Sequence, residues 1–328
     1  MPSSLSPGTD MSTLLNLLKD GRFHSGQVLG EALGISRSAV WKQLQQLQRE
    51  LNVPIHKVRG RGYQLADPLS LLDAEVIKST VMPEWNVEIL ETIDSTNAYA
   101  LRAIAQAQVA PLLVLAERQT AGRGRRGRPW VSPYGENLYY SLALRLDGGM
   151  RRLEGLSLVV GLAVLHALRD LGVTGARLKW PNDLLVGDQK LAGILLELVG
   201  DPGDAWQVVI GIGINVNMRS APEVDRQWTS MRLQTGQLVD RNELVSNLSR
   251  SLGHYLERHA DEGFDALREE WEQADAWRGR AVSLISGTSQ VDGIALGIDA
   301  QGGLRLEVEG REQSFSGGEL SLRLRCGE

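Results

Sequence analysis

The sequence predicts an α+β protein of two or three domains, with short helices at its N-terminus and a mixed sheet in its centre. In the first sixty-odd residues, apolar side chains recur at helical spacing and glycines interrupt them. Beyond residue 75, stretches with a period of 2 alternate with stretches with a period of 3.6. Many adjacent strands with few helices between them are more typical of a mixed sheet than of a doubly wound one. We place the domain boundaries at 1–66, 67–277 and 278–328.

Composition narrows the functional classes. The formal net charge of −5 excludes a general attraction to nucleic acid, so any such binding must be local. The single cysteine, Cys326, excludes an internal disulfide framework and fits a reducing cytoplasm. The N-terminal stretch MPSSLSPGTD lacks the features of a signal peptide, and no apolar run approaches the roughly 18 residues of a membrane span. We therefore expect a cytoplasmic protein outside the membrane.

The N-terminal domain has the layout of a helix-turn-helix. A first helix carries the leucines between Leu14 and Leu18, and Ser25 caps a second helix that ends before Gly34. Ser36 caps a third helix whose inward face is formed by Val40, Leu44, Leu47 and Leu51. Two short helices joined by a tight turn with a glycine are typical of this motif. The stretch HKVRGRGYQL then alternates like a β-hairpin and predicts a wing.

Charge favours DNA as the partner of this domain. Residues 34–64 hold six Lys or Arg against one acid, Glu50, which gives a local charge of +5. Such a patch is the electrostatic footprint of a DNA-binding domain. A protein-interaction module would also display exposed Lys and Arg, but the caps, the turn and the wing together favour DNA. The predicted DNA contacts lie at the start of the third helix and at the wing tip: Ser36, Arg37, Ser38, Trp41, Lys42, Arg59 and Arg61.

The central region follows a linker at residues 67–75. Strands are predicted at 87–91, 112–117, 137–146, 177–180, 184–186, 194–198 and 207–214. Strict alternation in residues 137–146 predicts that this strand is half-buried. Helices are predicted at 96–108, 153–171 and 241–277, and a β-rich segment begins at about Arg280.

The loop QTAGRGRRGRPW, residues 119–130, packs three glycines and four arginines together. Its glycines fit both the G-x-G-x-x-G of dinucleotide sites and the first and last glycines of a P-loop. Both motifs require a strand, a loop and a helix in that order, whereas here a second strand follows the loop. We therefore exclude both motifs. The loop either wraps backbone N–H groups and arginines around a phosphate or is a solvated basic tip, and by itself it does not decide between these.

Three later stretches favour a ligand pocket. LKWPNDLL places Lys179 at a strand end, where its ammonium can meet a carboxylate or a phosphate. KLAGILLE and GIGIN place Gly193, Gly211 and Gly213 in strands, as if backbone must approach a ligand closely. Strand glycines are more often bulges, so each stretch is weak alone. Together they describe a pocket with a glycine floor and a lysine beside it.

The chain resembles the biotin–protein ligases in five motifs, which occur in this order: TIDSTN, QTAGRGRRGRPW, LKWPNDL, KLAGIL and GIGIN. With a winged helix in front, the chain resembles the bifunctional type that also represses the biotin operon. The resemblance covers essentially the whole chain. It implies a central ligase domain related to class II synthetases and an SH3-like barrel at the C-terminus.

The resemblance implies a reaction in two steps. Biotin and MgATP form biotinoyl-5′-AMP and pyrophosphate, and the acyl group then passes to a lysine of the biotin carboxyl carrier protein of acetyl-CoA carboxylase. It implies that Lys179 lies between the biotin carboxylate and the α-phosphate, and that Arg123 and Arg125 act with it in catalysis. The implied binding residues are Ser95, Thr96, Asn97, Gln119, Gly122, Arg123, Gly124, Arg125, Trp130, Lys179, Gly193, Gly211, Gly213, Asn215, Trp228 and Arg323.

The residues agree with this chemistry. Adenylation is a displacement at phosphorus that needs alignment and charge stabilisation, and it needs no protein nucleophile. The chain has no G-x-S-x-G, and its five histidines show no metal-ligand spacing, so we expect no protein metal site; Mg²⁺ would arrive with ATP.

Regulation follows as a hypothesis. If the adenylate orders the arginine loop, the ordered loop can complete a surface for a homodimer, and the dimer would bind a two-fold operator. The adenylate would then act as corepressor. Two rivals remain. One is a lipoate or octanoyl ligase on a related fold, and the other is a transcription factor whose large domain only senses a ligand.

Overall fold

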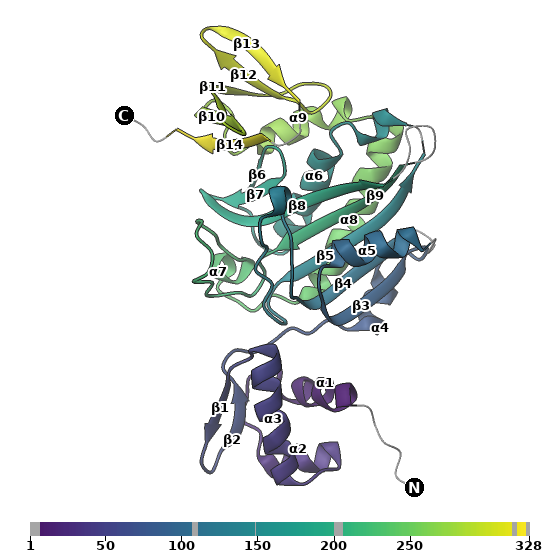
Figure 1. Ribbon diagram of the computed structural model, residues 1–328, viewed down its shortest axis with the longest axis vertical. Helices are drawn as coiled ribbons and strands as arrows, with labels where there is room; N and C mark the ends of the chain where they lie inside the picture. The colour runs from purple at the N-terminus through teal and green to yellow at the C-terminus, as the bar shows by residue number, and fades with distance from the viewer. Residues whose placement is uncertain (1–6, 107–110, 148, 200–205, 317–319, 326–328) are drawn as a thin grey trace.

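The computed structural model describes residues 7–106, 111–147, 149–199, 206–316 and 320–325. Cys326 lies outside the described residues. The winged helix occupies one end of the molecule and the C-terminal strands the other, with a seven-stranded sheet between them (Figure 1). The α+β fold class is confirmed.

The N-terminal domain is the predicted winged helix. It consists of α1 (Pro7–Leu18), α2 (Gly26–Leu33), α3 (Arg37–Leu51), β1 (Ile55–Val58) and β2 (Gly62–Leu65). Both predicted serine caps are confirmed, because Ser25 accepts from the amide of Val28 and Ser36 from that of Ala39. Gly34 ends α2 with a φ of 67°, the left-handed conformation that favours glycine. All four predicted inward residues of α3 are buried.

The central sheet runs in the order β3-β4-β5-β9-β8-β7-β6. The β3–β4 pair is parallel and the other pairs are antiparallel, so the predicted mixed sheet is confirmed. The strands are β3 (Asn86–Ile93), β4 (Leu112–Gln119), β5 (Leu138–Leu146), β6 (Ala176–Lys179), β7 (Asp183–Val186), β8 (Gln189–Val199) and β9 (Trp206–Ile214).

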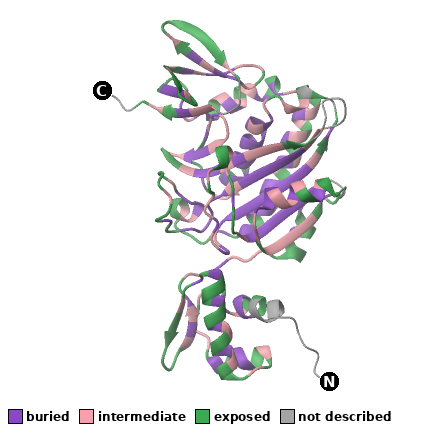
Figure 2. Ribbon diagram, viewed as in Figure 1, coloured by how far each residue is buried: buried purple, intermediate pink, exposed green. Residues whose placement is uncertain are grey.

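Helices cover the two faces of this sheet differently. One face packs on α6 (Leu156–Asp170), α8 (Arg241–Glu262) and α9 (Asp265–Ala274) in the largest apolar cluster. The other face packs on α5 (Thr96–Ala105), whose Ala100 and Ala103 contact β4, β5 and β9. Helix α5 covers only part of its face, and the strands beside it are largely buried or intermediate (Figure 2).

Several predictions of detail were wrong. The strand β5 is buried on both faces rather than half-buried, because α5 covers the face that carries its polar residues. The helical region 241–277 divides into α8 and α9 at Gly263, whose φ is 79°. Two short helices, α4 (Ala74–Thr80) and α7 (Met231–Thr235), lie where none was expected. Neither contains enough apolar periodicity to stand out in the sequence.

The C-terminal strands form an antiparallel sheet in the order β13-β12-β11-β10-β14. They are β10 (Ala281–Ser286), β11 (Ser289–Ile298), β12 (Leu304–Val308), β13 (Arg311–Phe315) and β14 (Leu320–Leu324). Hydrogen bonds are among the contacts that join this sheet to the central domain. The indole of Trp180 donates to the carbonyl of Gly302 (3.0 Å), and Glu272 of α9 accepts from the amide of Ile298 (3.1 Å).

None of the helices in the described parts of the chain is long and apolar enough to cross a bilayer.

A half-buried carboxyl just before β5 predicts a pH effect on stability. Burial raises the pKa of Glu136 from 4.5 to about 7. The folded chain therefore keeps this proton between pH 4.5 and 7, where the unfolded chain has lost it, and stability falls as pH rises through that window. We expect Glu136→Gln to remove this penalty. The free energy of unfolding of the variant minus that of the wild type should increase by about 1–3 kcal/mol between pH 4 and pH 8. Urea unfolding at both pH values measures it, and an equal difference at both would contradict the assignment.

Candidate active site and nucleic-acid interface

The N-terminus of α5 lies over the centre of the sheet and gathers four of the predicted residues. Ser95 caps the helix, and Gln119 Oε1 accepts from both the amide and the hydroxyl of Thr96 (2.9 and 3.1 Å). Ser141 of β5 donates to Asn97 Oδ1 (2.5 Å), and Asn97 Nδ2 donates to Glu197 (2.8 Å). The four predicted residues are thus hydroxyls and amides, and the carboxylate of Glu197 next to Asn97 is paired with Arg123. Such groups suit a neutral, polar ligand ring.

The three predicted glycines form one patch of the same sheet face. Gly193 and Gly213 are direct cross-strand partners in β8 and β9, and Gly211 lies two residues along β9. A Cβ at Gly213 would lie 2.5 Å from the indole of Trp130, and a Cβ at Gly211 would overlap the amide of Asn97. The glycines therefore make room for groups that lie flat on the sheet. Among the described residues, the indole N–H of Trp130 is one of the few buried donors without an acceptor.

The arginine loop folds back across this floor. Gly124 donates to the carbonyl of Arg128 (2.7 Å), and Trp130 donates to that of Gly122 (2.9 Å). At its tip, Arg126 has a φ of 61° in a 3₁₀ turn, a conformation uncommon outside glycine.

Two arginines of the loop contact the sheet. Arg125 Nη1 donates to Asn182 Oδ1 (3.0 Å), and Arg123 Nη2 lies 3.3 Å from Glu197 Oε1. The loop is a cover over the glycines, with its guanidinium groups directed at the polar residues around them.

A carboxylate with two lysines lies at the edge of the floor. Asp183 Oδ1 accepts from Lys190 Nζ (2.5 Å), and Asp183 Oδ2 lies 3.5 Å from Lys179 Nζ. Burial alone would raise the pKa of Asp183, but the ammonium groups of Lys190 and Lys179 hold it below its ordinary value. Burial lowers the pKa of Lys179.

The two lysines differ in position. Lys179 Nζ lies 4.5 Å above the ring of Trp277, at the side of the C-terminal domain. Lys190 Nζ lies 5.3 Å from the ring centroid of Trp130 and only 3.0 Å from where a Cβ at Gly193 would be, directly over the glycine floor. Sequence reasoning singled out Lys179 and missed both Lys190 and Asp183. The pairing of β7 with β8, which brings Asp183 opposite Gly193, is the signal that could have found them.

More arginines converge beyond the lysines. Burial lowers the pKa of Arg128, and the charges of Arg226, Arg126 and Arg323 lower it further. Arg323 comes from β14 of the C-terminal sheet, so three separate segments bring positive charge to this side of the site. A dense cation cluster of this kind favours a polyanion such as a triphosphate.

The segment around Trp228 borders the same region. Lys190 donates its amide to Gln227 (3.1 Å) and accepts from the amide of Thr229 (2.9 Å), which places Trp228 beside the start of β8. Asn215 uses its side-chain amide to donate to the carbonyls of Thr229 (2.9 Å) and Lys190 (3.4 Å). Asn215 therefore holds this segment in place.

The predicted DNA-contacting residues are exposed on two parts of the winged helix, the start of α3 and the tip of the β1–β2 hairpin. Arg37, Ser38, Trp41 and Lys42 are exposed on α3, and the side chain of Trp41 is 43% exposed despite its size. Arg59 and Arg61 lie at the tip of the β1–β2 hairpin, where the guanidinium of Arg61 stacks on Phe23 (4.0 Å). Large exposed aromatics and arginines on a helix-turn-helix are arranged for a nucleic-acid groove.

Three family models match the chain, one in each region. An HTH domain matches residues 11–64, the biotin/lipoate A/B protein ligase family matches 89–215, and the biotin protein ligase C terminal domain matches 279–323. The bifunctional ligase/repressor BirA of Salmonella typhimurium is 46% identical over 95% of this chain and 97% of its own length. That of Escherichia coli is also 46% identical, over 94% and 96%. The chain belongs to the biotin protein ligase family.

A solved structure supports the same fold. The biotin protein ligase from Aquifex aeolicus in complex with biotin and ATP has a TM-score of 0.65 and 32% identity, and it matches 73% of this chain and 99% of its own. The two BirA relatives match the present chain along nearly its whole length, including the winged helix. The protein is therefore both a biotin–protein ligase and a DNA-binding repressor.

The wing arginines of the ligase predict a salt-dependent contribution to DNA binding. We expect the double variant Arg59→Ala/Arg61→Ala to bind duplex DNA about tenfold more weakly. In a plot of log K against log[salt], the slope should become less steep by about 1 for each phosphate contact that the variant loses. Fluorescence anisotropy at several salt concentrations measures both quantities. Arg268→Ala on α9 removes an exposed arginine far from the wing and is the control. Equal affinities and slopes for the double variant and this control would refute the interface.

Proposed function

We propose that the ligase activates biotin with MgATP and then biotinylates the carboxyl carrier protein of acetyl-CoA carboxylase. A carboxylate oxygen of biotin attacks the α-phosphorus of ATP and pyrophosphate leaves, which gives biotinoyl-5′-AMP. The amine of a carrier lysine then attacks the acyl carbon, and AMP leaves as the amide forms. Mg²⁺ enters with ATP as part of the substrate.

The position of Lys190 over the glycine floor carries this proposal. Its ammonium lies 3.0 Å from where a Cβ at Gly193 would be, and it contacts Asp183, whose charge also acts on Arg128 of the arginine cluster. A biotin carboxylate and an α-phosphate that meet there would share this cation, which neutralises charge as the bond forms. Lys179 shares Asp183 with Lys190, and we assign it a supporting role on the same anion. Arg123 and Arg125 would close the loop over the adenylate.

The other predicted residues fit around this centre. Ser95, Thr96, Asn97 and Gln119 would bind the biotin ring, while Trp130, Trp228 and Arg323 would border the nucleotide. Biotin-dependent exchange of labelled pyrophosphate into ATP tests the first step, and transfer of biotin to the isolated carrier tests the second. A protein that exchanges with lipoate and not with biotin would be the rival ligase. A protein that exchanges with neither would only sense its ligand.

We further propose that biotinoyl-5′-AMP is the corepressor and promotes a homodimer that binds a two-fold operator ahead of biotin synthesis genes. The exposed basic face of α3 is the surface offered to that DNA. A protein that binds an operator and biotinylates the carrier protein must reach both the chromosome and the carrier, so we place it in the cytoplasm. Sedimentation with and without biotinoyl-5′-AMP tests the dimer, and an unchanged mass at micromolar protein would contradict it.

A further inference from the structure

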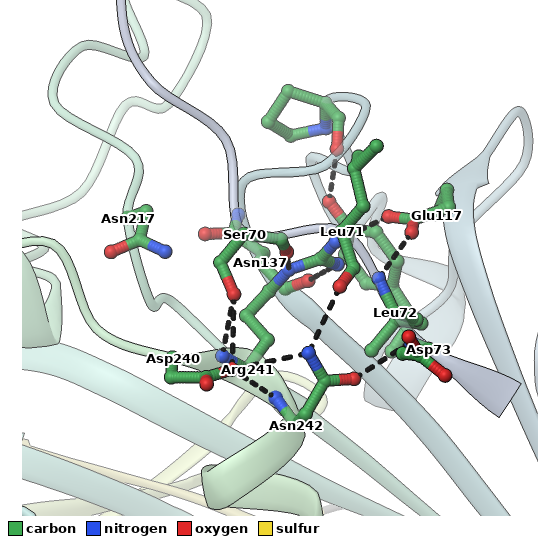
Figure 3. Close-up of polar contacts among 12 residues, drawn as sticks. Ser70, Leu71, Leu72, Asp73, Glu117, Asn137, Asn217, Asp240, Arg241 and Asn242 are labelled. Carbon is green, nitrogen blue, oxygen red and sulfur yellow. Dashed lines mark hydrogen bonds and ion pairs between the residues drawn. The ribbon is translucent and has the colours of Figure 1, made fainter. Parts of the chain in front are cut away.

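The linker between the winged helix and the central sheet is anchored in the interior of the catalytic domain (Figure 3). The side chain of Arg241, at the start of α8, is fully buried. Its Nε donates to the carbonyl of Ser70 (2.6 Å), its Nη1 to that of Asn137 (3.0 Å), and its Nη2 to Glu117. The other oxygen of Glu117 accepts from the amide of Leu72 (2.7 Å). Because both charges are buried, opening this anchor would leave an uncompensated charge in the interior.

A second attachment lies a few residues earlier in the linker and has a different character. Asp67 Oδ1 accepts from Arg219 Nη1 (3.0 Å) and from Arg232 Nη2 (3.2 Å). The side chains of Asp67 and Arg219 are 45% and 58% exposed, whereas that of Arg232 is 17% exposed. Ion pairs this exposed are individually weak, so small changes in geometry make or break them. We call these three residues the Asp67 clasp.

The two arginines of the clasp flank the segment that carries Trp228. In the middle of this segment, the backbones of Gln227 and Thr229 are hydrogen-bonded to Lys190 at the edge of the glycine floor. Ser230 then caps α7, and Arg232 lies in the first turn of that helix. A short run of backbone therefore joins the site lysine to the clasp.

On its other side, the clasp leads into the winged helix. Leu69, two residues after Asp67, donates its amide to the carbonyl of Lys19 at the end of α1 (3.0 Å). Its side chain is buried in the core cluster of the winged helix, together with Tyr134 of the catalytic domain. Two residues of backbone therefore connect Asp67 to a residue that is packed in the base of the DNA-binding domain.

We propose that the Asp67 clasp couples occupation of the nucleotide side of the site to the order of the linker, and through it to the orientation of the winged helix. The inference rests on the proposed role of biotinoyl-5′-AMP as ligand of this site. A ligand held against Trp228 fixes the segment between Arg219 and Arg232, which holds both guanidinium groups on Asp67. The buried anchor at Arg241 stays closed in either state, so the clasp is the part of the linker that responds to ligand.

Hydrogen–deuterium exchange of the full chain, with and without biotinoyl-5′-AMP, tests this coupling. In the wild type we expect the ligand to slow exchange in residues 216–232 and also, by about three- to tenfold, in residues 64–72. Asp67→Asn should keep the slowing in 216–232 and lose it in 64–72, with an unchanged ligation rate. Arg219→Gln should lose part of the ligand-induced slowing in residues 64–72.

The matched control is Asp147→Asn, which removes the carboxylate of another exposed pair, that with Arg145. It should behave as the wild type. Slowing in 64–72 that persists in Asp67→Asn, or that is missing from the wild type while 216–232 responds, would overturn the clasp. No slowing in the wild type at 119–130 or 216–232 would instead contradict the proposed binding of biotinoyl-5′-AMP, and the clasp would fall with it.

Discussion

Replacing Lys190 by alanine should lower biotin-dependent ATP–pyrophosphate exchange by about 10²- to 10³-fold, the effect expected when one positioned charge is removed from a developing anion. Lys190 Nζ lies over the glycine floor and is held there by Asp183 at 2.5 Å. The variant removes the cation closest to where the carboxylate and the α-phosphate would meet. Steady-state exchange with saturating biotin and ATP measures the loss.

Lys179→Ala is the matched comparison for this prediction. It removes a lysine from the same carboxylate, but one whose ammonium lies over Trp277 and contacts Asp183 at 3.5 Å instead of 2.5 Å. We expect its exchange rate to fall only about tenfold, because in the proposed arrangement it acts on the same anion as the second of the two cations. Equal losses for the two variants, or a larger loss for Lys179→Ala, would show that Lys190 is not the principal cation. A melting temperature within a few degrees of the wild type for each variant separates this from misfolding.

Replacing Arg241 by methionine should lower the free energy of unfolding of the catalytic domain by about 3–5 kcal/mol, as expected when a buried charge loses its partner. Glu117 would stay buried without its cation, and the carbonyls of Ser70 and Asn137 would each lose a donor. Urea unfolding followed by tryptophan fluorescence measures the change.

Arg145→Met is the control for this stability effect. Arg145 also pairs with a carboxylate, Asp147, but the two side chains are 61% and 79% exposed. Such a pair contributes at most about 1 kcal/mol. A loss of less than 1 kcal/mol for Arg241→Met would mean that water reaches this pair and that the linker is not anchored by it.

Local signals in the sequence predicted most of the secondary structure. The caps at Ser25 and Ser36 and the turn at Gly34 depend on residues within four positions, so their pattern can be recognised without the fold. The glycines of β8 and β9 were also recognisable, but the reason for them was not. Gly213 accommodates Trp130, which lies more than 80 positions away in the chain, and no periodicity reports such a contact.

The contacts that the sequence did not reveal depend on strand pairing or join distant segments. Lys190 and Asp183 are seven positions apart, but they meet only because β7 and β8 pair as a hairpin, and the predicted strands at 184–186 and 194–198 did not include either residue. Arg241 and Glu117 come from segments 124 positions apart, and charged residues are rarely fully buried, so nothing local in the sequence indicates this pair. The second face of β5 was misjudged for the same reason: Tyr139 and Ser141 are polar, yet both are buried on the side of the sheet that carries α5.

Native mass spectrometry of the full chain, supplied with equal amounts of biotin and lipoate and with MgATP but no carrier, shows which adenylate the site forms and retains. The site described around Lys190 should form and retain one biotinoyl-5′-AMP per chain, and Lys190→Ala should retain none. A retained lipoyl adenylate, or a wild-type chain that carries no adenylate at all, would contradict the assignment of this site.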